Sequence, residues 1–397
     1  MNDQAVVLGV GMVPFATPSR SEPYDVLAAG AARAALADAG LSYSDVQQAY
    51  VGYVYGDSTA GQHVLYGLPN QTGMTGVPVV NVNNNCSTGS TALFLGRQAV
   101  EGGAADVVLV LGFEQMRRGA LTAQWSDRPS PFARFDEVLD RELGADDDVP
   151  LAPRYFGSAG AAYAERFGLA PDTFARIAVK ARRHAAGNPY AVFREPVTLE
   201  EVLASPAVYG PLTRLQCCPP TCGAAAAVLV SSRYAHEHGV SGGVRIRAQA
   251  MTTDTPSSFA GDLTKLVGYD MSKAAAEQVY AASGVAPEDL PVVELHDCFT
   301  TNELLTYEAL GLTPEGTAEK FVLDGDNTYG GRVVTNPSGG LLSKGHPLGA
   351  TGLAQCAELV WQLRGQAGPR QVEGARLGLQ HNIGLGGACV VTLYERA

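Results

Sequence analysis

Cys86 is the first residue whose type and setting suit nucleophilic chemistry. It follows three asparagines, residues 83–85, and precedes an amphipathic stretch that predicts a helix over residues 87–101. Unpaired backbone N–H groups and the positive end of a helix dipole favour the thiolate, the nucleophilic form of cysteine. The alternative is a small buried cysteine, which is how most free cysteines occur.

His346 lies in a glycine-rich segment, GHPLGATG over residues 345–352. Histidine titrates near neutral pH, which suits proton transfer or oxyanion stabilisation, whereas a structural histidine at a turn is the alternative. Residues 86–93 align with residues 346–353 and share glycine, threonine and leucine at the same offsets. We interpret this similarity as an internal duplication, in which a pseudo-two-fold axis would bring Cys86 and His346 together.

Two further motifs contain residues that suit chemistry. His296 and Cys298 follow a predicted strand over residues 292–295, where doubly wound folds place their functional residues. A strand end with a core cysteine and a capping Asp297 is the alternative. Residues 381–387 predict a glycine-rich turn between two strands, whose N–H groups could hold a substrate, although the residues alone favour a plain tight turn.

The elements that must position these residues follow a βαβ pattern, because short apolar runs alternate with amphipathic, alanine-rich stretches. The predicted strands cover residues 5–10, 49–54, 106–112, 223–231, 244–250, 292–295, 377–380 and 388–394. The predicted helices cover residues 24–39, 87–101, 271–283 and 352–363. The run over 106–112 has no polar alternation, which is typical of a parallel sheet covered on both faces.

The halves of the duplication are separated by a segment of different character. Residues 117–211 have mixed charges, recurring prolines and no long β-branched runs, so we expect an inserted, largely helical and irregular segment. Long insertions on a rigid scaffold usually carry binding function. We therefore expect an N-terminal half over residues 1–116, completed by 212–240, and a C-terminal half over residues 241–397.

Composition excludes several classes of function. The formal net charge is −12 and basic residues do not cluster, which argues against a nucleic-acid partner. No apolar run reaches the ~18–20 residues that span a bilayer. The start of the chain lacks a signal-peptide pattern and the seven cysteines are an odd number, so we expect a cytoplasmic protein without a disulfide framework.

A zinc site is the one metal interpretation that the spacing invites. Cys217, Cys218 and Cys222 lie close together, and His236 and His238 follow. The histidine spacing is shorter than in usual structural zinc sites, and a predicted strand separates the two clusters. We therefore expect no metal.

These motifs together resemble the thiolase family, specifically the thiolase domain of the sterol-carrier-protein type. The resemblance extends from GVGM (9–12) to VTLY (391–394). It includes GDST (56–59), NNNCSTGSTAL (83–93), SSF (257–259), HDCF (296–299), NELLTYEALGL (302–312), GDNTYGG (325–331), NPSGG (336–340), GHPLGATG (345–352) and QHNIG (380–384). It implies a thiolase fold: an α/β protein with duplicated βαβ halves in five αβαβα layers and an inserted loop domain.

The resemblance also implies catalytic roles. Cys86 would be the acyl-accepting nucleophile, and His346 its activating base and an oxyanion-hole donor. Ordinary thiolases carry a second cysteine where this chain has Asn382, and in this subtype Cys298 is thought to act as the acid and base instead. His296 stands where other thiolases have an asparagine that positions an oxyanion-hole water.

The activity implied by the resemblance is CoA-dependent cleavage of 3-oxoacyl-CoA by a ping-pong mechanism, with a preference for bulky, 2-methyl-branched or sterol side-chain acyl groups. CoA would be a substrate, and no cofactor is expected. The partners implied are a second copy of the chain, in a homodimer or a dimer of dimers, and a small accessory protein of lipid metabolism. The residues expected to bind CoA or substrate are Arg117, Arg118, Arg128, Cys218, Ser257 and Gly384.

One departure and three alternatives accompany this interpretation. Cys222 replaces an aspartate of the family, which puts the packing of nearby loops in doubt, and no sterol-carrier domain is expected after residue 397. The alternatives are a carbon–carbon lyase of the steroid side-chain retro-aldolase type, a condensing enzyme, and a non-catalytic CoA- or lipid-binding scaffold. Relatives of the lyase type lack the nucleophilic cysteine, so Cys86 argues against the first.

Overall fold

The apolar runs form strands that pair in two halves with the same strand order. The computed structural model describes residues 3–68, 74–117, 125, 127–146 and 149–396. Ten strands are hydrogen-bonded in the order β10-β9-β11-β12-β8-β1-β7-β4-β2-β3. Within the sheet, the two halves are joined by the short pairing of β1 with β8. This pairing consists of Val6 with Arg245 and Val7 with Val244.

The elements of the N-terminal half are β1 (Ala5–Met12), α1 (Tyr24–Ala39), β2 (Gln48–Gly52), α2 (Ala60–Tyr66), β3 (Val79–Val82), α3 (Thr88–Glu101), β4 (Val107–Glu114), β7 (Gly223–Ser231) and α8 (Ser232–Glu237). Those of the C-terminal half are β8 (Val244–Thr252), α9 (Leu263–Leu266), α10 (Tyr269–Ser283), β9 (Val292–Glu294), α11 (Thr300–Ala309), α12 (Ala318–Leu323), β10 (Val334–Thr335), α13 (Gly340–Ser343), α14 (Thr351–Arg364), β11 (Leu377–Gly384) and β12 (Ala388–Arg396).

The pairing pattern confirms the duplication. In the N-terminal half β2 runs parallel to β3 and β4, and β7 runs antiparallel to β4 and β1. In the C-terminal half β9 runs parallel to β10 and β11, and β12 runs antiparallel to β11 and β8. Each half therefore repeats one topology, with α3 and α14 in equivalent places.

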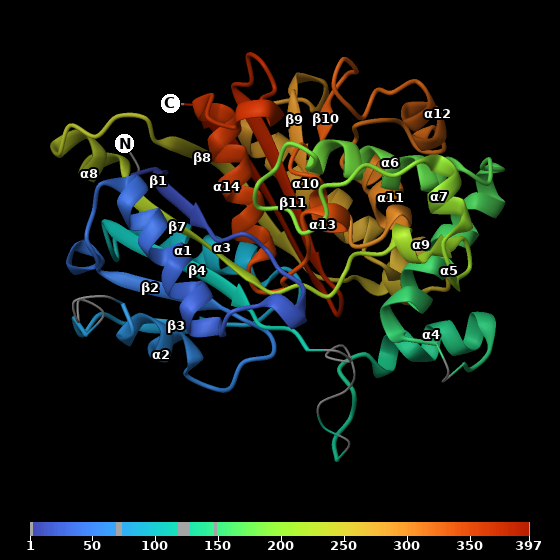
Figure 1. Ribbon diagram of the computed structural model, residues 1–397, viewed down its shortest axis with the longest axis horizontal. Helices are drawn as coiled ribbons and strands as arrows, with labels where there is room; N and C mark the ends of the chain where they lie inside the picture. The colour runs from blue at the N-terminus through green and yellow to red at the C-terminus, as the bar shows by residue number, and fades with distance from the viewer. Residues whose placement is uncertain (1–2, 69–73, 118–124, 126, 147–148, 397) are drawn as a thin grey trace.

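Three hydrophobic clusters show the layers. One packs α1 and α2 against the outer face of the first half-sheet, and another packs α10 and α11 against the outer face of the second. The third contains α3 and α14 between the inner faces of the two half-sheets (Figure 1). Strands β4 and β7 are buried along their whole length because both faces are covered. The five-layered αβαβα arrangement is thus confirmed.

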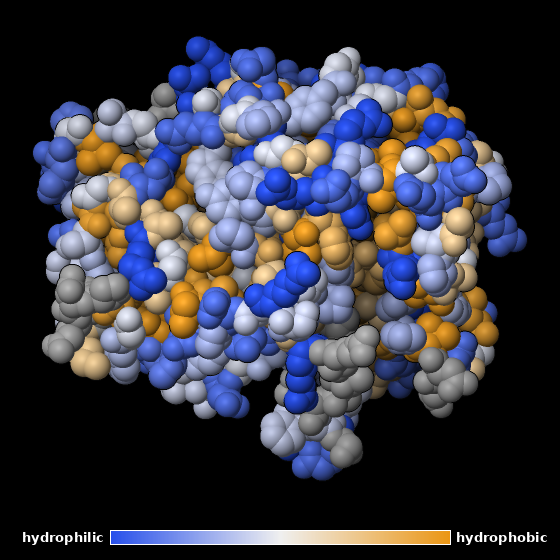
Figure 2. All heavy atoms as spheres, viewed as in Figure 1, coloured by the Kyte–Doolittle hydropathy of each residue, from blue (hydrophilic) through white to orange (hydrophobic). Residues whose placement is uncertain are grey.

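The described part of the segment between the halves is built mainly from helices. It contains α4 (Ala133–Leu143), α5 (Leu151–Phe167), α6 (Thr173–Ala185), α7 (Leu199–Ala204) and a short hairpin of β5 (Ala207–Tyr209) and β6 (Leu212–Thr213). Helix α5 packs against α9 and α11, and α6 packs against α11 of the C-terminal half (Figure 1). Hydrophilic and hydrophobic side chains are interspersed over the face seen in Figure 2. No helix in the described ranges is long and apolar enough to cross a membrane.

One predicted boundary is wrong in a way that matters for the site. The strand predicted over residues 377–380 continues to Gly384, which pairs with Ala388 of β12. His381 and Asn382 are therefore fully buried strand residues, and the turn is confined to the residues after Gly384. Their polar side chains suggest a turn in the sequence, but in the fold they hydrogen-bond inside the core.

Candidate active site

Helices α3 and α14 meet at their N-terminal ends because glycines leave room there. A Cβ atom on Gly89 would lie 2.8 Å from the Gly349 carbonyl oxygen, and one on Gly352 would lie 2.1 Å from Ser90 Oγ. Cys86 precedes Ser87, the N-cap residue of α3, and His346 lies in the turn before α14. The crossing therefore brings the two duplicated helix starts, and with them Cys86 and His346, to one point.

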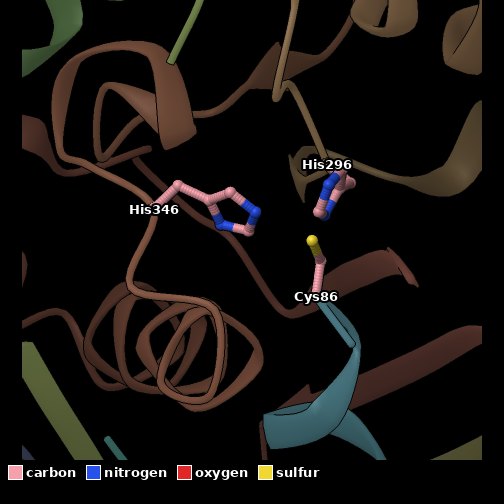
Figure 3. Close-up of side chains that lie close together, drawn as sticks. All are labelled: Cys86, His296 and His346. Atoms are coloured by element: carbon pink, nitrogen blue, oxygen red, sulfur yellow. The ribbon is translucent and has the colours of Figure 1, made fainter. Parts of the chain in front are cut away.

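His296 completes a three-residue cluster at this point (Figure 3). It follows β9, and its ring stands nearly perpendicular to that of His346, at an interplanar angle of 88° with 5.0 Å between the ring centroids. The thiol sulfur of Cys86 and one nitrogen of each histidine lie within 4.8 Å of one another. A nucleophile and two groups that can exchange protons thus share one small, mostly buried volume.

Hydrogen bonds make His346 a proton acceptor toward this volume. The Thr351 hydroxyl donates to the Pro347 carbonyl at 3.0 Å, so its oxygen accepts from His346 Nδ1 at 2.7 Å. The ring proton therefore resides on Nδ1, and Nε2 presents a lone pair. Nε2 is buried and has no hydrogen-bond partner, so it is free to take the Cys86 proton.

His296 has the opposite tautomer. The side-chain amide nitrogen of Asn382 lies 2.8 Å from His296 Nδ1 and is only a donor, so Nδ1 must accept. The ring proton of His296 is therefore on Nε2, which becomes a hydrogen-bond donor. One histidine of the pair can accept a proton, and the other can donate a hydrogen bond to developing negative charge.

Burial keeps all three groups uncharged at neutral pH. It lowers the pKa of His346 to about 3, and burial together with the charges of His346 and His381 lowers the pKa of His296 well below its usual value. Burial, followed by the nearby Glu114, raises the pKa of Cys86 to about 12. Burial therefore opposes the stabilisation of the thiolate that the helix start would give, and Cys86 must lose its proton to a base during attack.

A cavity of about 1500 Å³ reaches the three asparagines that precede Cys86, although Cys86 itself does not line it. Asn85, Gly384, Arg117 and Arg128 are among the residues that line it, together with apolar residues such as Phe132 of the inserted segment. Arg118 lies outside the described residues. Both described arginines are exposed, and Arg128 forms an ion pair with Asp127 at 2.8 Å.

Comparison with known proteins agrees with this geometry. Residues 5–233 match the family model "Thiolase, N-terminal domain", and residues 254–394 match "Thiolase C-terminal domain-like". The chain is 55% identical to sterol carrier protein 2 of Homo sapiens, over 98% of this chain and 71% of that protein. It belongs to the thiolase family.

Two more similarities extend this result. The chain is 34% identical to an acetyl-CoA acetyltransferase of Methanothermobacter thermautotrophicus, over the whole of both chains. The solved Ltp2-ChsH2(DUF35) aldolase superposes with a TM-score of 0.82 at 27% identity, over 99% of this chain and 98% of that chain. The thiolase scaffold of this chain is thus shared by proteins named as acyltransferases and as an aldolase.

The remaining predicted residues of this thiolase lie at different distances from the cluster. Cys298 is buried two residues after His296, and its carbonyl oxygen accepts the N–H of Cys218 at 2.9 Å. Burial raises the pKa of Cys298 well above its usual value, and the Cys218 and Cys86 thiols raise it further. Ser257 does not line the cavity, and its hydroxyl donates to Asp270 at 2.6 Å.

Thiol and imidazole are also zinc ligands, and the Cys86, His296 and His346 cluster has the required closeness. Zinc would need a lone pair on Nε2 of His296, whereas Asn382 places a proton there. The hydrogen bonds therefore favour proton transfer over coordination. The other cysteine cluster forms no site with His236 and His238, because the whole of β7 separates Cys222 from α8.

The departure at Cys222 leaves the catalytic cluster intact. Cys222 is buried, pairs with Ala16, and its thiol lies 3.4 Å from the Met116 carbonyl oxygen. The preceding Thr221 accepts the backbone N–H of His346 at 3.2 Å. The segment with the altered residue thus supports the His346 turn through Thr221, while Cys222 packs in the core.

Sequence reasoning missed three residues that support the cluster. Glu114 accepts backbone N–H groups from Val54, Tyr55 and Gly349, and its position as the only charged residue of an apolar strand was a usable signal. Thr351 also had a signal, because it aligns with a threonine in the duplicated motif. Asn382 was noted only as a replacement for cysteine, and its contact with His296 has no counterpart in local sequence.

Proposed function

We propose that this thiolase cleaves 3-oxoacyl-CoA with CoA through an acyl-enzyme on Cys86. The observation that carries the proposal is the pairing of opposite histidine tautomers around one thiol. Thiolysis needs a base for the nucleophile and hydrogen-bond donors for the oxyanion, and this pair supplies one of each.

In the first half-reaction the thiol proton of Cys86 passes to Nε2 of His346 while the sulfur attacks the C3 carbonyl carbon. The carbonyl oxygen becomes negative and is stabilised by a hydrogen bond from Nε2–H of His296. The C2–C3 bond then breaks, its electron pair remains on C2, and a proton from Cys298 gives the first acyl-CoA. The acyl group stays on Cys86 as a thioester.

In the second half-reaction free CoA enters and gives its thiol proton to the Cys298 thiolate. The CoA sulfur attacks the thioester carbonyl, the bond to Cys86 breaks, and the Cys86 sulfur recovers its proton from His346. The raised pKa of Cys298 keeps its thiol protonated before the first step, and it makes the thiolate left by that step a strong base toward the CoA thiol.

The cavity supports the substrate class. Arg117 and Arg128 line its solvent side and would pair with the phosphates of CoA, while Gly384 and the inserted segment border the acyl and pantetheine path. Its volume of about 1500 Å³ exceeds the ~300–1000 Å³ of ordinary ligand sites, which supports a ligand as large as an acyl-CoA.

The test is Cys86→Ala assayed by loss of 3-oxoacyl-CoA absorbance with a linear and a 2-methyl-branched substrate. We expect at least a ~10³-fold loss of turnover, because no other group forms the acyl-enzyme. Mass spectrometry of the wild type without CoA should find the acyl group on the Cys86 peptide. Cys217→Ala, which removes a partly buried thiol outside the cluster, is the matched control. Thiolysis by the Cys86 variant at the wild-type rate would refute the proposal.

A second candidate is carbon–carbon lysis, which the similarity to the Ltp2-ChsH2(DUF35) aldolase favours. A retro-aldol cleavage needs no acyl-enzyme and no free CoA. Cleavage of a 3-hydroxyacyl-CoA that survives in Cys86→Ala would therefore identify the lyase. That aldolase pairs Ltp2 with a DUF35 protein in its name, which supports an accessory subunit for this chain as well. Co-purification with a DUF35 protein would test it.

A further inference from the structure

A directional chain of buried hydrogen bonds ends on His296. The Tyr394 hydroxyl donates to Gln380 Oε1 at 2.5 Å, and Gln380 Nε2 donates to Ser90 Oγ at 2.8 Å. Ser90 Oγ donates to Asn382 Oδ1 at 2.8 Å, and Asn382 Nδ2 donates to His296 Nδ1 at 2.8 Å. The five side chains joined by these hydrogen bonds are each at most 1% exposed, so water does not compete for the bonds.

The direction of the chain is fixed at its start. Gln380 Nε2 also lies 2.7 Å from the Gly352 carbonyl oxygen, which can only accept, so the amide of Gln380 cannot be reversed. Ser90 Oγ accepts the hydrogen bond from Gln380, and the atom of Asn382 that it contacts is Oδ1, so its own hydroxyl hydrogen is donated to Asn382. Asn382 in turn presents its amide nitrogen, and not its oxygen, to His296.

We propose that Asn382, oriented by Ser90 and Gln380, is a positioning residue that fixes the tautomer of His296 and so keeps an N–H donor on Nε2 at the reaction centre. A neutral imidazole has a single N–H, so the donor exists at Nε2 only while Nδ1 accepts a hydrogen bond. If Nδ1 were protonated, both catalytic histidines would present lone pairs to Cys86, and the oxyanion would lose its imidazole donor. The catalytic consequence rests on the proposed thiolysis, whereas the tautomer itself does not.

The variant that separates this role from simple packing is Asn382→Asp. A carboxylate only accepts, so neutral His296 would place its proton on Nδ1 and lose the donor at Nε2. Protonation to imidazolium would restore it, and the adjacent carboxylate raises the pKa of His296 toward the accessible range. The other titratable groups facing His296 are His346, His381 and Cys86, and all of them are present in both proteins.

We expect Asn382→Asp to lower kcat about 10²-fold at alkaline pH, with a much smaller effect on KM, and to regain activity as the pH falls. The wild type should show no such rise. Asn382→Ala and Ser90→Ala are the matched controls, because they loosen the same contact without adding an acceptor, and they should lower kcat without creating the pH dependence. Equal, pH-independent losses in Asn382→Asp and Asn382→Ala would reduce Asn382 to a packing residue and overturn the proposal.

Nitrogen-15 NMR of histidine-labelled protein tests the tautomer without any turnover. In the wild type the His296 signals, assigned by their absence in His296→Ala, should show a protonated Nε2 and an unprotonated Nδ1. In Asn382→Asp near pH 8 the proton should move to Nδ1. A wild-type His296 protonated on Nδ1 refutes the inference even if thiolysis is confirmed, and the expected tautomer in a protein that fails to cleave 3-oxoacyl-CoA refutes only the proposed function.

Discussion

At the scale of single residues, the site depends on neutral groups whose hydrogen bonds decide which atoms donate and which accept protons. His296 and His346 have the same side chain and nearly the same burial, yet their Nδ1 partners are a donor in one case and an acceptor in the other. Their chemical roles therefore differ through the second nitrogen of each ring. Cys86 needs such an arrangement, because burial raises its pKa to about 12 and the thiol does not ionise by itself.

The titration of Glu114 should be visible in the pH dependence of the unfolding free energy. Burial raises its pKa from 4.5 to about 7, although three backbone N–H groups oppose the shift. The folded state therefore binds a proton more tightly than the unfolded state, so this group favours folding at low pH and loses that contribution as the pH rises through about 7. The shift corresponds to about 3 kcal/mol of unfolding free energy.

We expect Glu114→Gln to remove this pH dependence. Urea unfolding at several pH values should show the wild type losing about 2–3 kcal/mol relative to the variant between acidic and mildly alkaline pH. Loss of the Glu114 charge should also lower the pKa of Cys86 and move its alkylation by iodoacetamide to lower pH. Parallel stability curves for the two proteins would contradict the assignment.

At the scale of elements, the crossing of α3 and α14 determines whether the cluster forms. These helices come from opposite halves of the chain, and the glycines at their starts let the two backbones touch. The same crossing places Ser90 of α3 against Gly352 of α14 and Asn382 of β11. The catalytic residues and the hydrogen-bond chain behind them therefore share one packing contact.

Gly352→Ala should disrupt both the catalytic cluster and the hydrogen bonds that lead to His296. Its Cβ would lie 2.1 Å from Ser90 Oγ and 2.3 Å from the Ser90 backbone nitrogen, so the two helix backbones must separate. We expect a loss of about 1–3 kcal/mol in unfolding free energy and a larger proportional loss of kcat. In Gly67→Ala the new Cβ would have no neighbour closer than 3.4 Å, so unfolding and turnover should change little. A Gly352 variant that turns over normally would show that the crossing is not tightly constrained.

At the scale of the whole molecule, one edge of the sheet stands out. Strand β3 is the last in the order and, among the described strands, pairs with β2 alone; Val80 on it is 45% exposed. Nearby on α2, Tyr66 is 51% exposed. An open edge with apolar side chains favours pairing with another strand, which supports the expected homodimer.

If a homodimer forms through this edge, Val80→Lys should weaken it, because the new ammonium would have to be desolvated between two paired edges. Light scattering after size-exclusion chromatography should then give a smaller mass for the variant than for the wild type. Leu323→Lys at the end of α12, where Leu323 is 51% exposed, adds the same charge elsewhere and should leave the mass unchanged. A Val80 variant with the wild-type mass would place any oligomer contact on another surface.

The sequence by itself determined the fold class and the chemical types at the centre. Apolar runs without polar alternation specify strands covered on both faces, and helices between them specify parallel connections. The five layers were expected only from the resemblance to the thiolase family. The similarity of residues 86–93 to 346–353 was enough to predict that Cys86 and His346 meet. His296 was found because it directly follows a predicted strand.

Only the tertiary structure decided the protonation state of these groups and which ring nitrogen of each histidine carries a proton. The pKa of Cys86 depends on burial, which is a property of packing and not of neighbouring residues in the chain. The tautomer of His296 depends on Asn382 and on Ser90, which lies 292 positions from Asn382 in the sequence. A hydrogen bond between such distant residues leaves no local pattern, because it requires only that two short polar side chains be brought together, and the fold alone brings them there.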